Sequence, residues 1–155
     1  MSEARFWLLK TEPEVYSIDD LARDGRTFWE GVRNYTARNW MRDGMKLVDR
    51  VLIYHSNAEP PGVAGVARIV AEAYPDPTQF DSTSNYFDPG SKAEDPRWLR
   101  VDVGFESKLP RLVPLDELKA HPGLVGLEVT RKGSRLSVCP VSPEHFQIIL
   151  GLGGA

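Results

Sequence analysis

Residues 63–74 read VAGVARIVAEAY. Apolar side chains are too dense in this stretch for a strand that keeps one face in water, and most of them are small. Gly65 lies inside the stretch, and a glycine within a strand is typical of a bend. These features indicate a barrel strand that is buried on both faces or bent at Gly65. The stretch therefore predicts a small, strongly bent sheet.

Shorter strands are predicted on either side of this stretch. Residues 6–9 form one apolar run, and residues 51–54 form another, with Val48 shortly before it. Residues 98–106 alternate between apolar and polar with a period of two, which is the clearest strand signal in the chain. Residues 136–138 predict a last short strand. The sheet should therefore contain about five to six strands, most of them antiparallel.

Capping residues predict where the helices begin. Ser17, Asn34 and Ser142 each precede a segment with helical spacing, and all three are favoured N-cap residues. Helices are predicted at residues 18–23, 35–43, 114–119 and from residue 143 onward. The strands and helices do not alternate regularly, as they do in a doubly wound sheet. We therefore predict an α+β domain with a bent sheet or small barrel and short flanking helices.

Residues 75–96 are rich in Asp, Pro, Ser and Asn and predict a long loop with a helical turn near residues 78–80. Loops of this length in a compact domain are usually functional or disordered. The aromatic residues Phe80, Tyr86 and Phe87 favour an ordered loop.

Length and composition predict a single domain over residues 1–155, with residues 151–155 as a frayed tail. The net charge of −3 argues against a protein that coats duplex DNA through its phosphates, although it allows a reader of one or a few bases. No apolar window is long enough for a membrane span. The N-terminus lacks a secretory pattern. We therefore expect a cytoplasmic protein with no membrane partner, and we expect a monomer.

Polar clusters follow three apolar runs. Lys10-Thr11-Glu12 follows the first run, His55-Ser56-Asn57 follows the second, and Cys139-Pro140 follows the last. Small barrels place ligand sites where strand ends converge. If these ends share one rim, Lys10, Glu12, His55, Ser56 and Asn57 surround one pocket. The alternative is that each cluster is simply a turn, since Ser, Asn and Pro are turn residues.

Residues 29–35 read WEGVRNY and place aromatic rings beside glycine, arginine and asparagine. Trp29 is a candidate for stacking on a flat ligand, and Gly31 lets the backbone approach closely. The alternative is that Trp29 belongs to the core. Arg33 and Arg38 are candidates for phosphate contacts, or else they lie on a solvated helix face.

Catalytic and metal-binding patterns are weak in this sequence. His55 and Ser56 are adjacent, so on a strand they point to opposite faces and do not readily form a hydrogen bond. Three histidines and one cysteine provide no spaced ligand set, so we expect no metal and no cofactor. An enzyme that acts on a modified nucleotide stays as an alternative, with Glu12, His55 or Asp88 as its acid or base. The balance of the sequence favours a protein that is not an enzyme.

A set of motifs in fixed order covers nearly the whole chain. They lie at residues 6–13, 16–21, 29–35, 37–39, 54–57, 61–65, 72–78, 86–89, 96–98, 101–103 and 135–138. In these motifs the chain resembles the EVE domain, a PUA-like domain that is related to the YTH readers of RNA. The resemblance implies a PUA-like pseudo-barrel with a pocket for a nucleobase. The chain departs from the family pattern at Val48, where the family frequently has glycine, and at Cys139, where the family frequently has glutamine.

The resemblance also implies a function and a set of site residues. EVE domains are thought to recognise modified cytosines in DNA, and YTH relatives hold a methylated adenine of RNA in an aromatic cage. The pocket residues carried over are Lys10, Glu12, Trp29, Gly31, Val32, Arg33, Asn34, Asn39, His55, Ser56, Asn57, Asp88 and Trp98, to which the charge pattern adds Arg38. We therefore expect a reader module that binds DNA or RNA carrying a methylated or hydroxymethylated base. A small-molecule sensor is a further alternative.

Overall fold

The computed structural model describes residues 5–134 and 136–155. The elements in chain order are β1 (Phe6–Thr11), α1 (Ile18–Asp24), β2 (Arg26–Trp29), α2 (Tyr35–Asp43), β3 (Arg50–His55), β4 (Gly62–Pro75), the 3-10 helix η1 (Pro77–Phe80), β5 (Leu99–Pro114), α3 (Leu115–Ala120), the 3-10 helices η2 (Pro122–Leu124) and η3 (Glu128–Thr130), β6 (Val138–Val141) and α4 (Pro143–Leu152). None of these helices is long and apolar enough to cross a bilayer.

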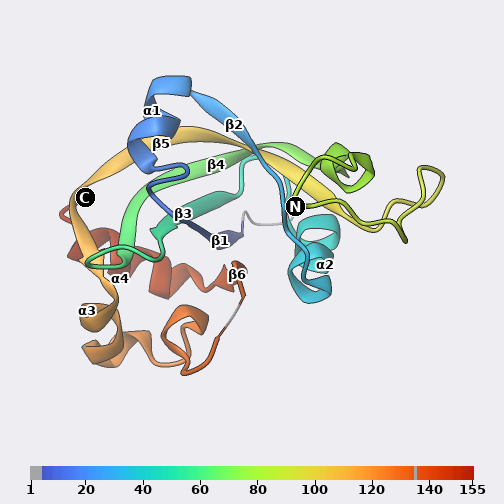
Figure 1. Cartoon of the computed structure of the whole chain (residues 1–155). Helices are drawn as coiled ribbons and strands as arrows, with labels where there is room; N and C mark the ends of the chain where they lie inside the picture. The colour runs from blue at the N-terminus through green and yellow to red at the C-terminus, as the bar shows by residue number, and fades with distance from the viewer. Residues whose placement is uncertain (1–4, 135) are drawn as a thin grey trace.

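The six strands form one mixed sheet in the order β2-β5-β4-β3-β1-β6. β1 and β3 are parallel, and every other pair is antiparallel. The register of β4 against β5 shifts at four places, and each shift bends the pair. Figure 1 shows β4 and β5 sweeping through a strong curve. The predicted α+β fold with a bent, mostly antiparallel sheet is confirmed, and the sheet stays open between β2 and β6.

Gly65 has a packing role at this bend. A Cβ atom at Gly65 would lie 2.5 Å from Ile18 of α1 and 2.8 Å from the carbonyl oxygen of Ser107. Only glycine therefore lets α1 lie this close to the sheet.

Two hydrophobic cores lie on the two faces of the sheet. The first core contains Ile18 and Leu21 of α1 together with Ala37 and Met41 of α2. The second contains Leu118 of α3 with Phe146 and Ile149 of α4, among other buried residues. Each face of the sheet is thus covered by a pair of helices, which buries β3 and the first half of β4 on both sides.

The predicted helix caps are confirmed. Ser17 accepts a hydrogen bond from the backbone N–H of Asp20, and the Asp20 carboxylate accepts one from the N–H of Ser17. Asn34 caps α2 by accepting from the N–H of Ala37, and Ser142 caps α4. These short-range bonds satisfy N–H groups that a helix leaves free at its start.

Some boundaries differ from the sequence expectation. β2 was not predicted, β5 continues to Pro114, and β6 begins at Val138. β2 is a short edge strand that pairs with β5. The sequence of residues 26–29 alone does not predict this pairing, because the partner strand is far away along the chain. Val48 lies outside β3, in the left-handed region with φ of 68°. The turn before β3 thus places a valine where a glycine has no steric cost.

The chain end also differs from the expected frayed tail. α4 runs through Leu152, and the N–H of Gly153 donates to the carbonyl of Ile149. The Gly153 carbonyl in turn accepts from the N–H of Arg111 in β5. These bonds tie the end of the chain to the sheet, a long-range contact that composition does not reveal.

Candidate functional site

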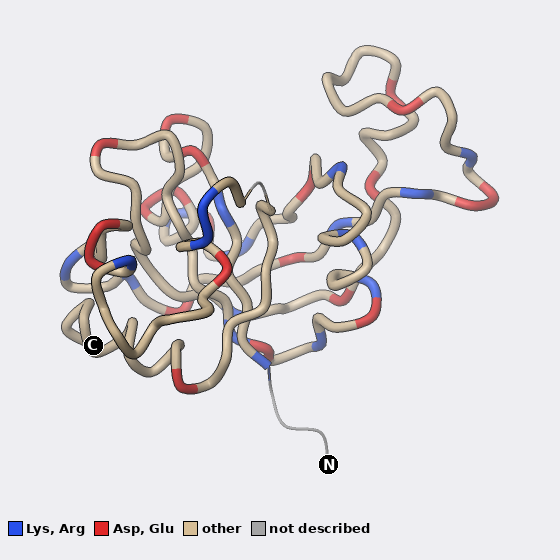
Figure 2. Tube along the Cα trace, turned by 90° about the horizontal axis from the view of Figure 1, so that it is seen from below, with Lys and Arg blue, Asp and Glu red and all other residues tan. Residues whose placement is uncertain are grey.

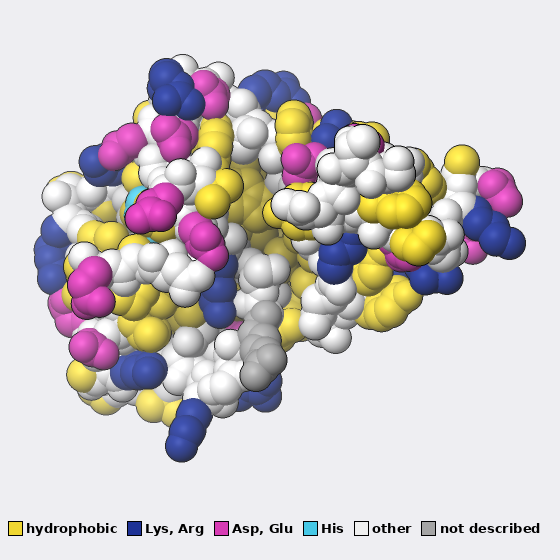
Figure 3. Space-filling view, in the orientation of Figure 1, with side chains coloured by type: hydrophobic (Ala, Val, Ile, Leu, Met, Phe, Trp, Pro, Cys, Tyr) yellow, Lys and Arg dark blue, Asp and Glu magenta, His cyan; other side chains and the backbone are white. Residues whose placement is uncertain are grey.

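A cavity of about 700 Å³ opens where the ends of several strands meet. Six of the residues expected at the site line it: Lys10, Glu12, Trp29, Gly31, Val32 and Ser56. Figure 3 shows the hollow between the body of the protein and the lobe at its right, with hydrophobic side chains deep inside it. Its size is in the range of small-molecule and cofactor sites.

Strand direction explains why these residues converge. β1 and β3 are parallel, so Lys10 and Ser56 emerge at the same edge of the sheet. β6 runs antiparallel to β1, so the residue before its start, Ser137, lies at that edge as well. The hypothesis of a shared rim therefore applies to the first two polar clusters. Cys139 and Pro140 instead lie inside β6, because this strand begins rather than ends at the cavity.

Trp29 is both a core residue and a wall of the cavity. Its side chain is 8% exposed and belongs to the first hydrophobic core. It also lines the cavity, so its place in the core is compatible with the predicted contact with a ligand. Gly31 next to it has a φ of 79°, and a Cβ atom there would lie 2.6 Å from the ring of Tyr86. The glycine therefore lets the Tyr86 ring close against the turn that carries Trp29.

Charged side chains line part of the cavity. The Glu12 carboxylate accepts a hydrogen bond of 2.6 Å from the Asn57 side chain, and Asn57 has a φ of 49°. Glu30 lies 3.3 Å from Arg100, and burial followed by repulsion from Asp76 raises the pKa of the Glu30 carboxyl. The cavity therefore presents the ammonium group of Lys10 and two carboxylates to a ligand.

Asp76 joins the turn beside Trp29 to the long loop. Its carboxylate accepts from the N–H of Gly31 at 3.0 Å, from Arg33 at 3.2 Å and from the N–H of Thr78 at 2.9 Å. Burial acts to raise the pKa of this carboxyl, but the hydrogen bonds from Thr78, Gly31 and Arg33 outweigh it and hold the pKa below its usual value. Arg33 also donates to the carbonyl of Tyr86 at 2.7 Å. Arg33 thus fixes the loop instead of projecting freely into solvent.

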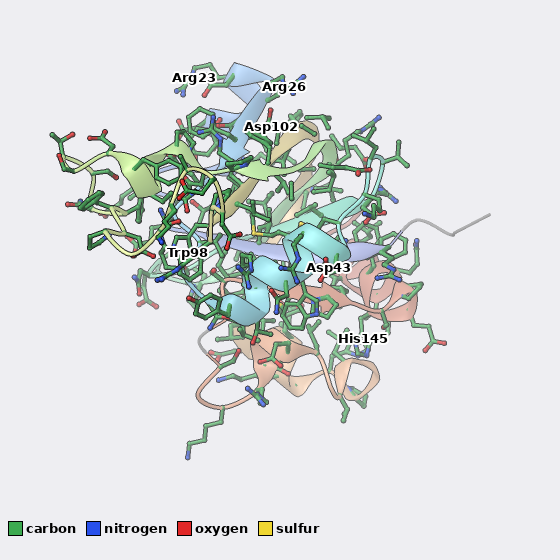
Figure 4. All side chains as sticks on the ribbon, turned by 90° about the vertical axis from the view of Figure 1, so that its right-hand side faces the viewer. Arg23, Arg26, Asp43, Trp98, Asp102 and His145 are labelled. Atoms are coloured by element: carbon green, nitrogen blue, oxygen red, sulfur yellow. The ribbon has the colours of Figure 1, made fainter. Side chains whose placement is uncertain are left out.

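Trp98 and Asp88 form the second anchor of the loop. The indole N–H of Trp98 donates to the Asp88 carboxylate at 2.7 Å, and the ring stacks on Tyr35 of α2 at a centroid distance of 4.8 Å. The bond from Trp98 is the main cause that lowers the pKa of Asp88, with the N–H of Gly90 next. Figure 4 shows Trp98 between the loop and α2. Neither residue lines the cavity.

Three further expected site residues do not line the cavity and have contacts within the protein. His55 is buried, its Nε2 accepts from the N–H of Ile18, and burial lowers its pKa. Asn34 is the cap of α2. Arg38 donates to Asn39 and to the Arg97 carbonyl, on an exposed part of the surface.

Two of the three groups considered for catalysis lie outside the cavity lining. Asp88 and His55 bond to structural partners, and Cys139 is fully buried in the second core, where burial raises the pKa of its thiol to about 12. Cys139 pairs with Leu8 of β1, outside the cavity lining. Across the described ranges, no cluster of three His, Cys, Asp or Glu side chains has the arrangement of a metal site.

Eight further residues line the cavity that the sequence did not single out for it: Thr11, Val15, Tyr16, Thr27, Phe28, Glu30, Tyr86 and Ser137. Thr27 and Phe28 lie on β2, the strand that was not predicted. Tyr86 carried a signal, since aromatic residues in a long polar loop favour order. Thr11 and Glu30 are sequence neighbours of expected site residues, within the polar cluster of residues 10–12 and the stretch of residues 29–35.

Comparison with known proteins places this site in a family. The EVE domain model matches residues 5–152. The chain is 43% identical to thymocyte nuclear protein 1 of mouse over 169 residues, which covers 96% of this chain and 74% of that protein. A crystal structure of a protein from Pseudomonas putida is 47% identical with a TM-score of 0.92, over 96% of this chain and 99% of that one.

A second solved structure includes a ligand. It is the human THYN1 protein in complex with DNA that contains 5-methylcytosine, 40% identical with a TM-score of 0.91 over 98% of this chain and 99% of that one. The match of the family model over nearly the whole chain, with relatives above 40% identity, shows that the chain belongs to the EVE domain family.

Proposed function

We propose that this protein is a nucleic-acid reader that accepts a modified cytosine base in the cavity beside Trp29. One observation carries the proposal: an indole wall faces charged and hydroxyl groups from three separate strand ends in a cavity of about 700 Å³. The human THYN1 protein, which shares the fold and 40% of the sequence, is seen with DNA that contains 5-methylcytosine. DNA carrying such a base is therefore the favoured partner.

Energetics set what the cavity has to supply. Removing a base from its stack costs a few kcal/mol of free energy. Stacking on Trp29 returns about 1–3 kcal/mol. Burial of one methyl group adds only about 0.8 kcal/mol. Hydrogen bonds to the edge of the base must therefore provide much of the selectivity.

The hardest competitor is thymine, because it carries the same methyl group as 5-methylcytosine. The two bases differ at position 4, where cytosine has an amino donor and thymine an oxygen acceptor. A carboxylate accepts from the amino group and repels the oxygen. Glu12 is suited to this role, because Asn57 holds one of its oxygens and among the described residues no side chain binds the other. Lys10 supplies a donor for a carbonyl oxygen of the base or for phosphate.

The test is a binding panel of short oligonucleotides that differ at one position: cytosine, 5-methylcytosine, 5-hydroxymethylcytosine, thymine or methylated adenine, in DNA and in RNA. We expect tightest binding to a modified cytosine in DNA. Equal binding of all bases would contradict the proposal. If the protein is a reader, its affinity for an oligonucleotide should fall with salt in proportion to the number of phosphate contacts. If it is a small-molecule sensor, its affinity should depend little on salt.

Glu12→Gln sharpens the panel. A glutamine amide can turn to offer either a donor or an acceptor, so the variant should lose discrimination of 5-methylcytosine against thymine by about five- to tenfold. Glu14→Gln, a matched change at an exposed neighbour outside the cavity lining, should leave the ratio unchanged. An unchanged ratio in Glu12→Gln would remove Glu12 from the site. A monomeric state and a cytoplasmic location stay predictions from the sequence.

A further inference from the structure

Exposed hydrophobic side chains gather at the mouth of the cavity. Val15, Phe28 and Tyr86 are 74%, 47% and 43% exposed, and all three line the cavity. They come from three separate segments: the turn before α1, the edge strand β2 and the long loop. Exposed apolar side chains that meet around one opening mark a binding surface, whereas scattered ones do not.

The two aromatic rings at this mouth share one arrangement. The Arg100 guanidinium lies over the Phe28 ring at 4.2 Å from its centroid, and Arg100 forms an ion pair with Glu30 at 3.3 Å. The Arg33 guanidinium lies over the Tyr86 ring at 5.5 Å and pairs with Asp76.

Both arginines are well shielded, with side chains that are 17% and 22% exposed. A carboxylate thus fixes an arginine, and the arginine backs a ring, on each of the two elements. Cation–π contact of this kind restrains the ring while nearly half of its surface stays open.

Rings that are restrained and still open to solvent are suited to a partner with a flat π face, because little side-chain freedom is lost when they bind. Nucleobases are such partners, and stacking on an aromatic ring tolerates any base. Positive and negative side chains are interspersed along the chain, and the net charge is −3 (Figure 2). We therefore expect contacts to the bases to add to the affinity that phosphate contacts provide.

We propose that Phe28 and Tyr86 are stacking platforms for the nucleotides on either side of the base in the cavity. The inference rests on the proposed reader function and extends it from a single base to a footprint of three neighbouring nucleotides. The occupant is a strand whose bases next to the inserted one are unpaired or locally opened. Phe28 and Tyr86 both line the cavity, so we place the nucleotides that flank the inserted base on these two rings.

The experiment compares Phe28→Leu and Tyr86→Leu with Phe87→Leu. Phe87 is 40% exposed on the same loop but does not line the cavity, so it is the matched control. Two ligands are titrated by calorimetry: a short single strand with one central 5-methylcytosine, and the free nucleoside 5-methyl-2′-deoxycytidine. Leucine keeps apolar bulk at an exposed position, and thermal unfolding confirms that each variant is folded.

We expect each mouth variant to bind the strand about tenfold more weakly and the nucleoside within about twofold of the wild type. The slope of affinity against salt should not change, since no phosphate contact is lost. Abasic sites on both sides of the 5-methylcytosine should weaken the wild type by about the product of the two single losses, roughly a hundredfold, and each single variant by only about tenfold, because one of its two stacking partners is already missing. Phe87→Leu should match the wild type throughout.

Three results would overturn the inference while the reader function stands: equal losses for strand and nucleoside, abasic neighbours that leave wild-type affinity unchanged, or equal losses in Phe28→Leu and Phe87→Leu. A wild-type protein that binds no modified strand at all refutes the reader function, and the stacking platforms with it.

Discussion

The regions around Trp29 and Trp98 were both predicted from the sequence to contact a base, but they have different roles in the structure. Trp29 and Trp98 are 8% and 6% exposed, and both were expected to contact a base. Trp29 lines the cavity, whereas Trp98 donates to Asp88 and stacks on Tyr35 at the base of the loop. Burial and residue type therefore do not decide which aromatic ring lines the cavity. The neighbours of the ring decide it: the indole N–H of Trp98 is already engaged within the protein.

The largest effect is expected at the loop anchor. Trp98→Ala should lower the free energy of unfolding by about 3–5 kcal/mol, since it removes a large buried ring and leaves the Asp88 carboxylate without its indole donor. Urea denaturation at neutral pH measures the change. A loss below about 1 kcal/mol would show that Trp98 is no anchor and would reopen a ligand role for it.

Asp76 tests the link between the two regions. Asp76→Asn should cost about 3 kcal/mol, the lower end of the range for breaking a buried pair, because Arg33 keeps some access to solvent. The folded-state pKa of Asp76 lies below the unfolded value, so its contribution is complete above the unfolded pKa and is lost as pH falls through the folded one. The variant should therefore show a shallower loss of stability than the wild type as the pH falls below the unfolded value of about 3.9. Parallel curves would contradict this assignment.

A substitution at Trp29 should weaken ligand binding more than it lowers stability. Trp29→Leu keeps apolar volume in the core but removes the stacking surface, so affinity for an oligonucleotide with 5-methylcytosine should fall about 5- to 150-fold. Calorimetry measures this affinity and does not depend on the tryptophan fluorescence that the substitution changes. Trp40→Leu is the control, since Trp40 packs against both cores and does not line the cavity. Equal affinity losses in the two variants would assign Trp29 to the core alone.

The smallest effect is expected at His55, another residue whose signal suggested a ligand. Burial lowers its folded-state pKa below the unfolded value of about 6.5. The neutral ring therefore contributes stability above that value, and the contribution is lost as pH falls through the folded pKa. In His55→Gln the fall in unfolding free energy just below pH 6.5 should be smaller than in the wild type. A variant whose stability falls as steeply as that of the wild type in this pH range would contradict the role of the neutral His55 ring.

Much of the fold was predictable because its signals are local. The caps Ser17, Asn34 and Ser142 and the alternation in β5 specify elements within a few residues of themselves. β2 was missed because its pairing depends on β5, which is about 70 residues away along the chain. At the site, six of the expected residues line the cavity, and Arg33, Trp98 and Asp88 hold the loop beside it.

The sequence by itself determined an α+β domain with a bent sheet, the positions of its helices, and the motifs that mark an EVE domain. Each of these depends on short-range periodicity, capping or residue order. The tertiary structure alone decided which polar groups share one cavity and which aromatic rings face it. Those properties depend on the parallel pairing of β1 with β3 and on the bend between β4 and β5, which join segments far apart along the chain.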